Sequence, residues 1–249
     1  MSDQPGSDHR GELLRLDRVV THIGAYHILH GVDLSVRRGR VTMLLGRNGA
    51  GKTTTLRTIM GLWKPRSGAI QFDGRPIFGL ETPDIARRGI AYVPETMGIF
   101  SQLTVQENMK LAVSSGRFDP DRLDDVFRFF PILKTKWNDR AGLMSGGQKQ
   151  MLAVARAIVE ERRLMIVDEP TKGLAPAVID QLIACILELK ARDTTILLVE
   201  QNFHMAQSVG DDVAVMDNGV VVHTGTMAEL AADEELQTRL LGLSLTSHQ

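Results

Sequence analysis

The sequence predicts an α/β fold: a mostly parallel sheet with helices on both faces, an N-terminal antiparallel β subdomain and an inserted helical subdomain. Three observations support this fold class. Strand-like and helix-like segments alternate through residues 164–217, which is typical of a parallel sheet. The first strand-like segments alternate apolar and polar residues, as half-buried antiparallel strands do. Between residues 94 and 161, helical periodicity dominates and strand patterns disappear.

The N-terminal third is predicted to be rich in strands. Residues 1–12 are polar and lack the apolar core of a signal peptide, so we expect a disordered tail. Antiparallel strands are expected at 13–20, 32–36 and 69–72, and Asp73-Gly74 is typical of a hairpin turn. The other expected elements are a strand at 41–45, a helix at 54–62, a short helix at 83–88 and a strand at 90–93.

The rest of the chain is predicted to supply the helical subdomain and then the second half of the α/β core. Thr104 and Glu107 have the spacing of a capping box, and a helix at 121–130 is expected to end at Pro131. Strands are expected at 164–167, 195–199 and 213–217, with helices at 176–190 and 202–209 between them. We expect one domain over 13–229, with its core at 13–93 and 162–229, its helical subdomain at 94–161, and a C-terminal helix and tail at 230–249.

The composition is ordinary for a globular protein of 249 residues, with 43% hydrophobic and 24% charged residues. Because 29 basic residues balance 30 acidic ones, we expect no nucleic-acid partner and no general attraction to an anionic membrane. No apolar run reaches the ~18 residues of a membrane helix, so no direct membrane insertion is expected. The single cysteine, Cys185, lies in an apolar stretch and is expected to be buried and unpaired, which fits a reducing cytoplasm.

Residues 46–54 form a candidate phosphate-binding loop. They read Gly46-Arg47-Asn48-Gly49-Ala50-Gly51-Lys52-Thr53-Thr54. This sequence fits G-x-x-x-x-G-K-[ST] between an apolar strand and a helix. The glycines let backbone N–H groups face phosphate oxygens, and the helix start adds unpaired donors. Lys52 is expected to reach the β and γ phosphates, and Thr53 to offer its hydroxyl to Mg²⁺. The loop therefore predicts binding of a nucleoside triphosphate; a glycine-rich turn without a ligand is the alternative.

A second candidate group is Asp168-Glu169, which ends the apolar strand at 164–167. Ligands gather at the carboxyl ends of parallel strands, where the phosphate loop also lies. Asp168 is then placed to hold Mg²⁺, directly or through water. Glu169 is placed to orient and deprotonate an attacking water. The alternative is a solvated acidic turn.

A third candidate group is Ser145-Gly146-Gly147-Gln148, which opens an amphipathic helix. A serine and two glycines at a helix start can bind an anion. Because this group lies in the helical subdomain, one nucleotide could contact both helix starts only if the second came from another subunit. The arrangement indicates a two-fold dimer with nucleotide between the protomers, and a plain serine N-cap is the alternative.

These three groups, in this order, resemble those of an ATP-binding cassette (ABC) transporter ATPase, over about residues 13–241. The resemblance implies a P-loop NTPase core that binds ATP and Mg²⁺. It implies that the phosphate loop of one protomer and Ser145-Gly146-Gly147-Gln148 of the other close on ATP, and that closure drives a membrane-spanning partner. The aspartate loop of the family would fall at 173–176. Glu169 would be the general base and Lys52 a catalytic phosphate ligand.

Three positions differ from the common family pattern. Glu95 replaces the glutamine that touches Mg²⁺ and faces the membrane partner. Its oxygen can still reach the metal or water, so Glu95 is a candidate metal ligand, but its charge would add to a cluster of carboxylates. Gln201 replaces a histidine; it can hydrogen-bond the γ phosphate or water but cannot become cationic. Hydrolysis is therefore expected to be slower or more dependent on the partner. Ile23 occupies the place of the adenine-stacking aromatic residue, so Tyr26 is the candidate, with a core or surface tyrosine as the alternative.

The Val93-Pro94-Glu95 and Val199-Glu200-Gln201-Asn202 segments look most like the second ATP-binding subunit of branched-chain amino acid importers. This resemblance implies a peripheral subunit on the cytoplasmic face of the plasma membrane. Its partners would be permease subunits contacted near Glu95 and Phe100, a second ATP-binding subunit that is the same or a paralogous chain, and indirectly an extracytoplasmic substrate-binding protein. Two alternatives remain: an ABC motor for another substrate (urea, aromatic acids, or lipid or polysaccharide export), and a soluble ATP-dependent regulatory switch.

Overall fold

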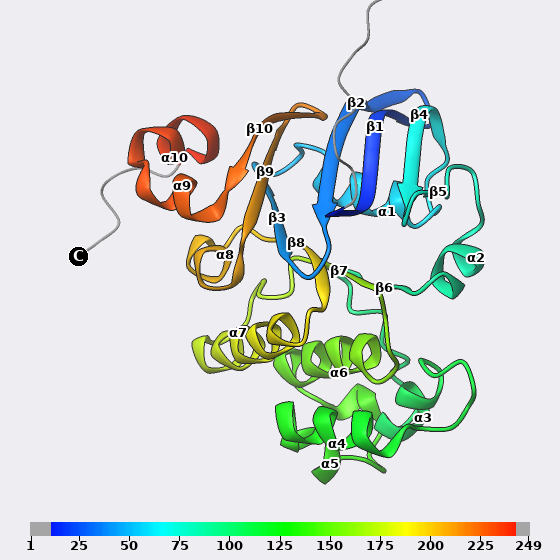
Figure 1. Cartoon of the computed structure of the whole chain (residues 1–249). Helices are drawn as coiled ribbons and strands as arrows, with labels where there is room; N and C mark the ends of the chain where they lie inside the picture. Colours follow the sequence, from blue (N-terminus) through cyan, green and yellow to red (C-terminus); the bar gives the residue numbers. More distant parts are fainter. Residues whose placement is uncertain (1–10, 243–249) are drawn as a thin grey trace, which may run out of the picture.

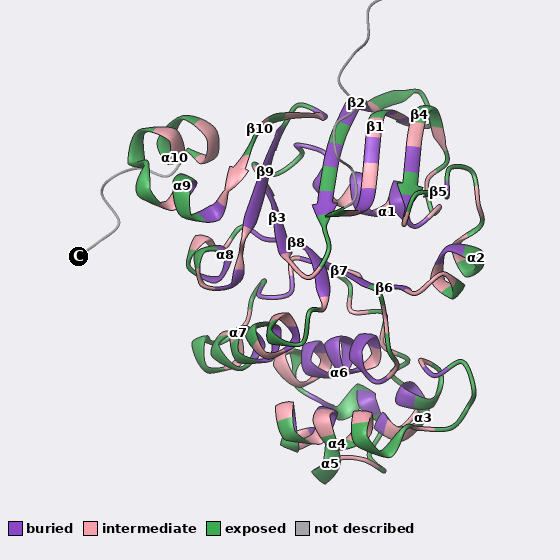
Figure 2. Ribbon diagram, viewed as in Figure 1, coloured by how far each residue is buried: buried purple, intermediate pink, exposed green. Residues whose placement is uncertain are grey.

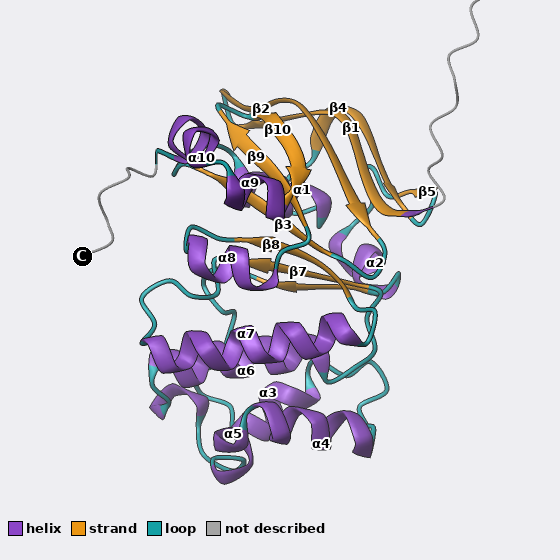
Figure 3. Cartoon of the chain, turned by 60° about the vertical axis from the view of Figure 1, so that its left-hand side comes forward, coloured by secondary structure: helices purple, strands orange, loops and turns teal. Residues whose placement is uncertain are grey.

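The computed structural model describes residues 11–242 and arranges them in layers (Figures 1 and 3). An antiparallel sheet lies on one side of a central, mostly parallel sheet, and helices cover the opposite side. Figure 3 shows α6 and α7 beneath the central strands and α3, α4 and α5 beneath those two helices. This arrangement confirms the predicted fold class.

The elements follow one another in this order: β1 (Glu12–Ile23), β2 (Tyr26–Arg37), β3 (Val41–Gly46), α1 (Lys52–Ile59), β4 (Pro65–Phe72), β5 (Arg75–Pro76), α2 (Thr82–Arg87), β6 (Ile90–Val93), α3 (Val105–Lys110), α4 (Pro120–Phe129), α5 (Pro131–Thr135), a 3₁₀ turn (Ala141–Leu143), α6 (Gly146–Ile158), β7 (Leu164–Asp168), α7 (Pro176–Ala191), β8 (Thr195–Val199), α8 (Phe203–Val209), β9 (Asp212–Asp217), β10 (Val220–Thr226), α9 (Met227–Ala232) and α10 (Glu234–Leu241).

The central sheet has the strand order β10-β9-β3-β8-β7-β6. The strands from β9 to β6 are parallel to their neighbours, and only β10 pairs antiparallel, with β9. As a result, the carboxyl ends of β3, β7, β8 and β6 meet at one edge of the sheet. This edge carries the phosphate loop and the acidic strand end.

Each face of the central sheet is covered by its own apolar cluster. Met165 and Val167 of β7 point into the cluster that α6 and α7 cover, whereas Ile166 points into the cluster shared with α1 and the antiparallel sheet. Strands that are covered on both faces read as continuous apolar runs, as β3, β7 and β8 do. Figure 2 shows these strands and α6 largely in the buried colour. The helices α1 and α6 therefore lie on opposite faces of the sheet.

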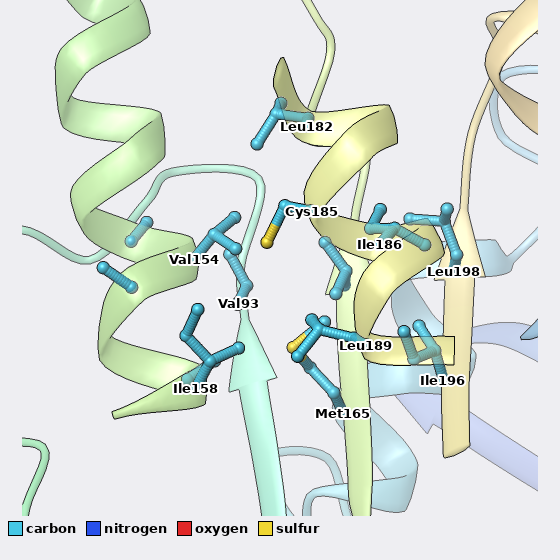
Figure 4. Close-up of a cluster of buried hydrophobic side chains, with 14 of the residues drawn as sticks. Val93, Val154, Ile158, Met165, Leu182, Cys185, Ile186, Leu189, Ile196 and Leu198 are labelled. Carbon is cyan, nitrogen blue, oxygen red and sulfur yellow. The ribbon is translucent and has the colours of Figure 1, made fainter. Parts of the chain in front are cut away.

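Figure 4 shows the cluster beneath the sheet, where Cys185 of α7 lies among apolar side chains that include Val154 of α6 and Met165 of β7. Cys185 is fully buried and unpaired, as expected. Burial raises the pKa of its thiol to about 12, so the residue acts as a packing group.

The helical part between β6 and β7 begins with α3, whose start has the predicted capping box. Thr104 accepts from the N–H of Glu107 over 3.1 Å, and the Glu107 carboxylate accepts from the N–H of Thr104 over 2.7 Å. Pro131 ends one helix, as predicted, but also begins the next. Its fixed φ and missing N–H suit the first position of α5.

Several predicted boundaries were wrong. β1 begins at Glu12, inside the predicted tail; residues 1–10 of that tail lie outside the described part of the chain. α1 begins at Lys52, two residues earlier than expected, because the helix starts directly from the phosphate loop. Two helices, α9 and α10, replace the expected single C-terminal helix, and residues 243–249 lie outside the description. β10 was not predicted. Among residues 11–242, no helix is both long and apolar enough to cross a bilayer.

Candidate functional site

The phosphate loop joins β3 to α1 and needs glycine at specific places. Gly46 has φ 141°, and a Cβ there would lie 2.2 Å from the carbonyl oxygen of Met216. Gly51 has φ 105° and is the N-cap of α1, with no side chain capping the helix. The first N–H groups of α1 are therefore free of a side-chain acceptor and can face an anion. This geometry is what the loop sequence predicts.

Lys52 lies inside the loop, with 4% of its side chain exposed. Its Nζ donates to the carbonyl oxygens of Gly46 over 2.8 Å and Arg47 over 3.1 Å, and lies 3.8 Å from Oε1 of Glu169. Burial lowers the pKa of Lys52, and the Glu169 and Asp168 carboxylates oppose that shift. The loop thus holds a cation beside the end of β7.

Asp168 is fully buried at the end of β7. Thr53 donates to its Oδ1 over 3.2 Å, and the hydroxyl of Tyr92 donates to its Oδ2 over 3.4 Å. Burial raises the pKa of Asp168 to about 6, and the Glu169 and Glu95 charges add to that shift. The structure therefore brings together two of the three predicted Mg²⁺ ligands, Thr53 and Asp168.

The donor set around Asp168 fits Mg²⁺. No group of three or more His, Cys, Asp or Glu residues that could hold a metal occurs in the described part of the chain. One carboxylate and one hydroxyl are hard oxygen ligands. Mg²⁺ keeps several waters and takes few protein ligands when it is bound with phosphates. These two side chains could therefore hold a magnesium ion that also takes phosphate oxygens and water.

Glu169 adopts a backbone conformation that is unusual for a residue with a side chain, with φ 46°. Its N–H donates to the carbonyl oxygen of Val199, over 2.9 Å. Its Oε1 accepts from Nε2 of Gln201 over 2.7 Å. The strained turn aims the carboxylate back towards Lys52 and Gln201, so these three predicted residues lie together.

Glu95, the third predicted metal ligand, has a different partner. Its Oε1 lies 2.6 Å from Nζ of Lys172, which also lies 3.8 Å from Oε2 of Glu169. The hydrogen bond to Glu95 raises the pKa of Lys172. The extra carboxylate expected at residue 95 is therefore balanced by a cation. Sequence reasoning missed Lys172, although its place three residues after Glu169 in a turn could have indicated it.

Glu200 is the second residue that sequence reasoning missed. It is buried, 2% exposed, directly after β8, and its carboxylate accepts hydrogen bonds from the loop after β7 and from its own loop. Burial raises the pKa of Glu200, and these hydrogen bonds oppose the shift. The Val-Glu-Gln-Asn segment drew attention to its neighbour, Gln201, instead.

Ser145 begins α6. Its Oγ accepts from the N–H of Gln148 over 3.3 Å, and Oε1 of Gln148 accepts from the N–H of Ser145 over 3.0 Å. A Cβ on Gly147 would lie 3.0 Å from a methyl group of Val178 in α7, so glycine permits close helix packing there. A Cβ on Gly146 would meet nothing within 4 Å, which leaves this face of the helix start open. The serine is an N-cap within this chain, with an open approach beside it.

Tyr26 is the first residue of β2 and pairs with Ile23 at the tip of the β1–β2 hairpin. With 76% of its surface exposed, it is not a core residue. Beside it in the hairpin, the rings of His22 and His27 stack with their centroids 4.3 Å apart. The tyrosine is free to meet a ligand, and its contact with adenine stays a prediction.

Comparisons with known proteins agree with this geometry. A family described as ABC transporter matches residues 29–172. The high-affinity branched-chain amino acid transport ATP-binding protein BraG of Pseudomonas aeruginosa is 39% identical, over 92% of this chain and 100% of its own length. A probable branched-chain amino acid transport ATP-binding protein, LivF of Archaeoglobus fulgidus, is 36% identical, over 87% of this chain and 93% of its own.

A solved structure gives the same result for the fold. The ADP conformation of an ATP-binding cassette of an ABC transporter matches with a TM-score of 0.78 at 26% identity, covering 93% of this chain and 99% of that chain. The phosphate loop and the acidic strand end of this chain thus lie in a fold that is shared with a known ATP-binding cassette. The chain therefore belongs to the ABC transporter family and is one of its ATP-binding cassettes.

Proposed function

We propose that this chain hydrolyses ATP to drive an importer for branched-chain or related amino acids. One observation carries the ATPase part: Lys52, Glu169 and Gln201 converge beside the buried Asp168 at the carboxyl ends of neighbouring strands. The substrate class rests on the names of the relatives BraG and LivF, which are branched-chain amino acid transport proteins.

In this proposal each residue has a separate task. The backbone of residues 46–54 binds the phosphates, and Lys52 binds the β and γ phosphates. Thr53 and Asp168 would hold Mg²⁺, which would draw charge from the phosphate oxygens. Glu169 orients and deprotonates the attacking water. Gln201 holds the Glu169 carboxylate and offers hydrogen bonds to the water or the γ phosphate.

The second half of the nucleotide site would come from another subunit. Residues 145–148 lie on α6, across the central sheet from α1, which supports their acting on a partner's nucleotide. Leu143, just before them, is 79% exposed, which favours a subunit contact at this place. The exposed residues 173, 175 and 176 of the predicted aspartate loop are available to the same partner.

The permease would dock in a cleft between the α/β core and the helical subdomain. A cleft of about 770 Å³ lies between α1, β6 and α6, and its lining includes Pro94, Thr96 and the arginines Arg57 and Arg156. Phe100, beside this cleft, is 50% exposed, and the Arg156 guanidinium lies over its ring. An apolar cleft with cationic groups suits a short permease segment that carries an acidic residue.

The docking cleft would communicate with the catalytic base through Glu95. This residue lies between Pro94 and Thr96 of the cleft and forms its ion pair with Lys172, which reaches Glu169. A permease that moves the loop after β6 would therefore move a charge next to the base. In this assembly the chain lies at the cytoplasmic face of the plasma membrane, and an extracytoplasmic binding protein delivers the amino acid to the permease.

The test is uptake of labelled branched-chain amino acids by a strain that lacks this chain, complemented with wild type or with Glu169→Gln. We expect the wild type to restore uptake and the variant to fail, and both to co-purify with the same permease from native membranes. Restored uptake of urea or an aromatic acid instead would reassign the substrate. A chain that co-purifies with no membrane protein would favour a soluble regulatory switch.

A further inference from the structure

One buried carboxylate connects the two loops that carry the proposed base and its glutamine partner. Oε1 of Glu200 accepts from the backbone N–H of Thr171 over 3.0 Å and from its hydroxyl over 2.8 Å. Oε2 accepts from the backbone N–H groups of Gln201 over 3.0 Å and Asn202 over 3.1 Å. Each oxygen thus serves a different loop.

The Glu200 carboxylate accepts four hydrogen bonds, two on each oxygen. A buried charge is costly unless hydrogen bonds compensate for it, and four donors on one carboxylate give strong, directional contacts. A leucine could fill much of the space after β8, but it could not join Thr171 to both Gln201 and Asn202. The chain therefore keeps a charged group where an apolar one would pack more cheaply.

The position of Glu200 fixes the geometry between Glu169 and Gln201. Thr171 lies two residues after Glu169, and Gln201 directly follows Glu200, so both ends of the 2.7 Å hydrogen bond between Glu169 and Gln201 are attached to this carboxylate. Asn202, whose N–H is the other donor to Oε2, is the N-cap of α8, and its Oδ1 accepts from the N–H of Met205 over 3.1 Å. The loop after β8 is therefore also fixed to a helix.

We propose that Glu200 is a positioning residue for ATP hydrolysis, which holds Gln201 against Glu169 by clamping the loops after β7 and β8 together. The inference rests on the proposed function, because it assigns Glu200 a role through the proposed base. Glu200 itself does not touch nucleotide. It sets where the Gln201 amide lies, and therefore how the Glu169 carboxylate meets water.

The substitution Glu200→Gln tests the clamp with little change in size. An amide has one accepting oxygen, so it can serve Thr171 or the pair Gln201 and Asn202, and its NH₂ group then faces N–H donors on the other side. Thr171→Val is a milder variant, because it removes only the hydroxyl donor and keeps the backbone bond. Thr171→Val provides the test if Glu200→Gln fails to fold.

Thr195→Val is the matched control, because Thr195 is buried at the opposite end of β8. Its hydroxyl accepts from the N–H of Gly39 over 2.9 Å, so the variant also loses one buried hydrogen bond. We expect it to lower the melting temperature without changing kcat. Any effect of Glu200→Gln that is merely loss of stability should appear in this control as well.

The experiment measures kcat and KM for ATP in the chain purified with its native membrane partners, in wild-type and Gln201→Ala backgrounds. We expect Glu200→Gln to lower kcat on the order of tenfold or more with KM for ATP unchanged, and Thr171→Val to lower it less. In the Gln201→Ala background both variants should add little further loss, because the residue through which they act is gone.

Equal losses of kcat in both backgrounds would overturn the positioning role, as would a loss that Thr195→Val reproduces. If Glu200→Gln does not fold, an unchanged kcat in Thr171→Val overturns it. These outcomes differ from failure of the proposed function. Wild-type turnover that Glu169→Gln leaves intact would contradict the assigned base, whereas additive losses in an enzyme that Glu169→Gln inactivates would contradict only the role of Glu200.

Discussion

The side-chain amide of Gln201 donates to the Glu169 carboxylate over 2.7 Å. This bond joins the loop after β8 to the loop after β7, at a place where the common family pattern has histidine. An amide does not become a cation near neutral pH. Gln201 can therefore orient the Glu169 carboxylate by a hydrogen bond, but it cannot place a positive charge beside it. The contact explains how a glutamine there can still serve a base.

We expect Gln201→Ala to lower kcat for ATP on the order of ten- to a hundredfold, because the Glu169 carboxylate loses the group that orients it. ATP binding should weaken much less than turnover, since Lys52 and the loop backbone are untouched and Gln201 offers at most one of the contacts to the γ phosphate. Steady-state turnover and equilibrium nucleotide binding check this. The matched variant Gln201→His, which restores a hydrogen-bonding ring, should retain more activity than alanine. Full activity in Gln201→Ala would contradict the role of the amide.

The Glu95–Lys172 ion pair should affect coupling more than stability. Both side chains are partly exposed, so Lys172→Met should change the melting temperature little. It removes the cation between Glu95 and Glu169, so stimulation of ATP turnover by the permease should fall. Turnover with and without permease checks this, with Lys172→Arg as the charge-conserving control. If the permease stimulates Lys172→Met as strongly as the wild type, the Glu95–Lys172 pair does not couple the permease to Glu169.

Gly46 should be far less replaceable than Gly49. A Cβ at Gly46 would collide with the carbonyl oxygen of Met216, whereas a Cβ at Gly49 meets nothing within 4 Å. We expect Gly46→Ala to cost more than about 3 kcal/mol and Gly49→Ala about 1 kcal/mol, since the latter suffers only from its positive φ. Urea unfolding of both variants checks the difference. Equal losses would show that the close approach of Met216 does not matter.

Asp125 should make the stability of the fold depend on pH in the acidic range. Arg192, directly after α7, and Arg128, on α4, hydrogen-bond its carboxylate and lower its pKa from 3.8 to about 2. A carboxyl group whose pKa is lower in the folded state contributes its full stabilisation at pH values above its unfolded-state pKa. It loses that contribution as the pH falls through its folded-state pKa. Asp125→Asn should therefore cost about 1 kcal/mol at pH 7.

The same variant should differ less and less from wild type between pH 4 and about pH 2, where the wild-type carboxylate becomes protonated. Thermal unfolding across this pH range measures the convergence. Asp124→Asn, on the same helix, is the control. A gap that stays constant down to pH 2 would mean that the arginines do not lower the pKa of Asp125.

The phosphate loop, the acidic strand end and the order of the core elements could be predicted from the sequence because local patterns encode them. Gly46, Lys52 and Asp168 belong to short motifs flanked by apolar strands. β10 also had a local signal, since Asn218-Gly219 before a run of valines is typical of a hairpin.

The clamp around Glu200 could not be predicted in the same way. Its contact with Thr171 spans 29 positions and exists only because β7 and β8 are neighbours in the sheet. Likewise, Lys172 and Glu95 are 77 positions apart, and the sequence alone suggests an unbalanced carboxylate at residue 95. Pairings between loop ends depend on strand order, which local periodicity does not contain.

The most direct test of the account is ATP turnover of the wild type and of Glu169→Gln, each purified with its membrane partners. We expect the variant to bind ATP and to lose turnover on the order of a hundredfold or more, because an amide cannot take the proton of the attacking water. It should also accumulate the ATP-bound dimer of cassettes. Turnover that persists in Glu169→Gln would contradict the assignment of the base and the mechanism built on it.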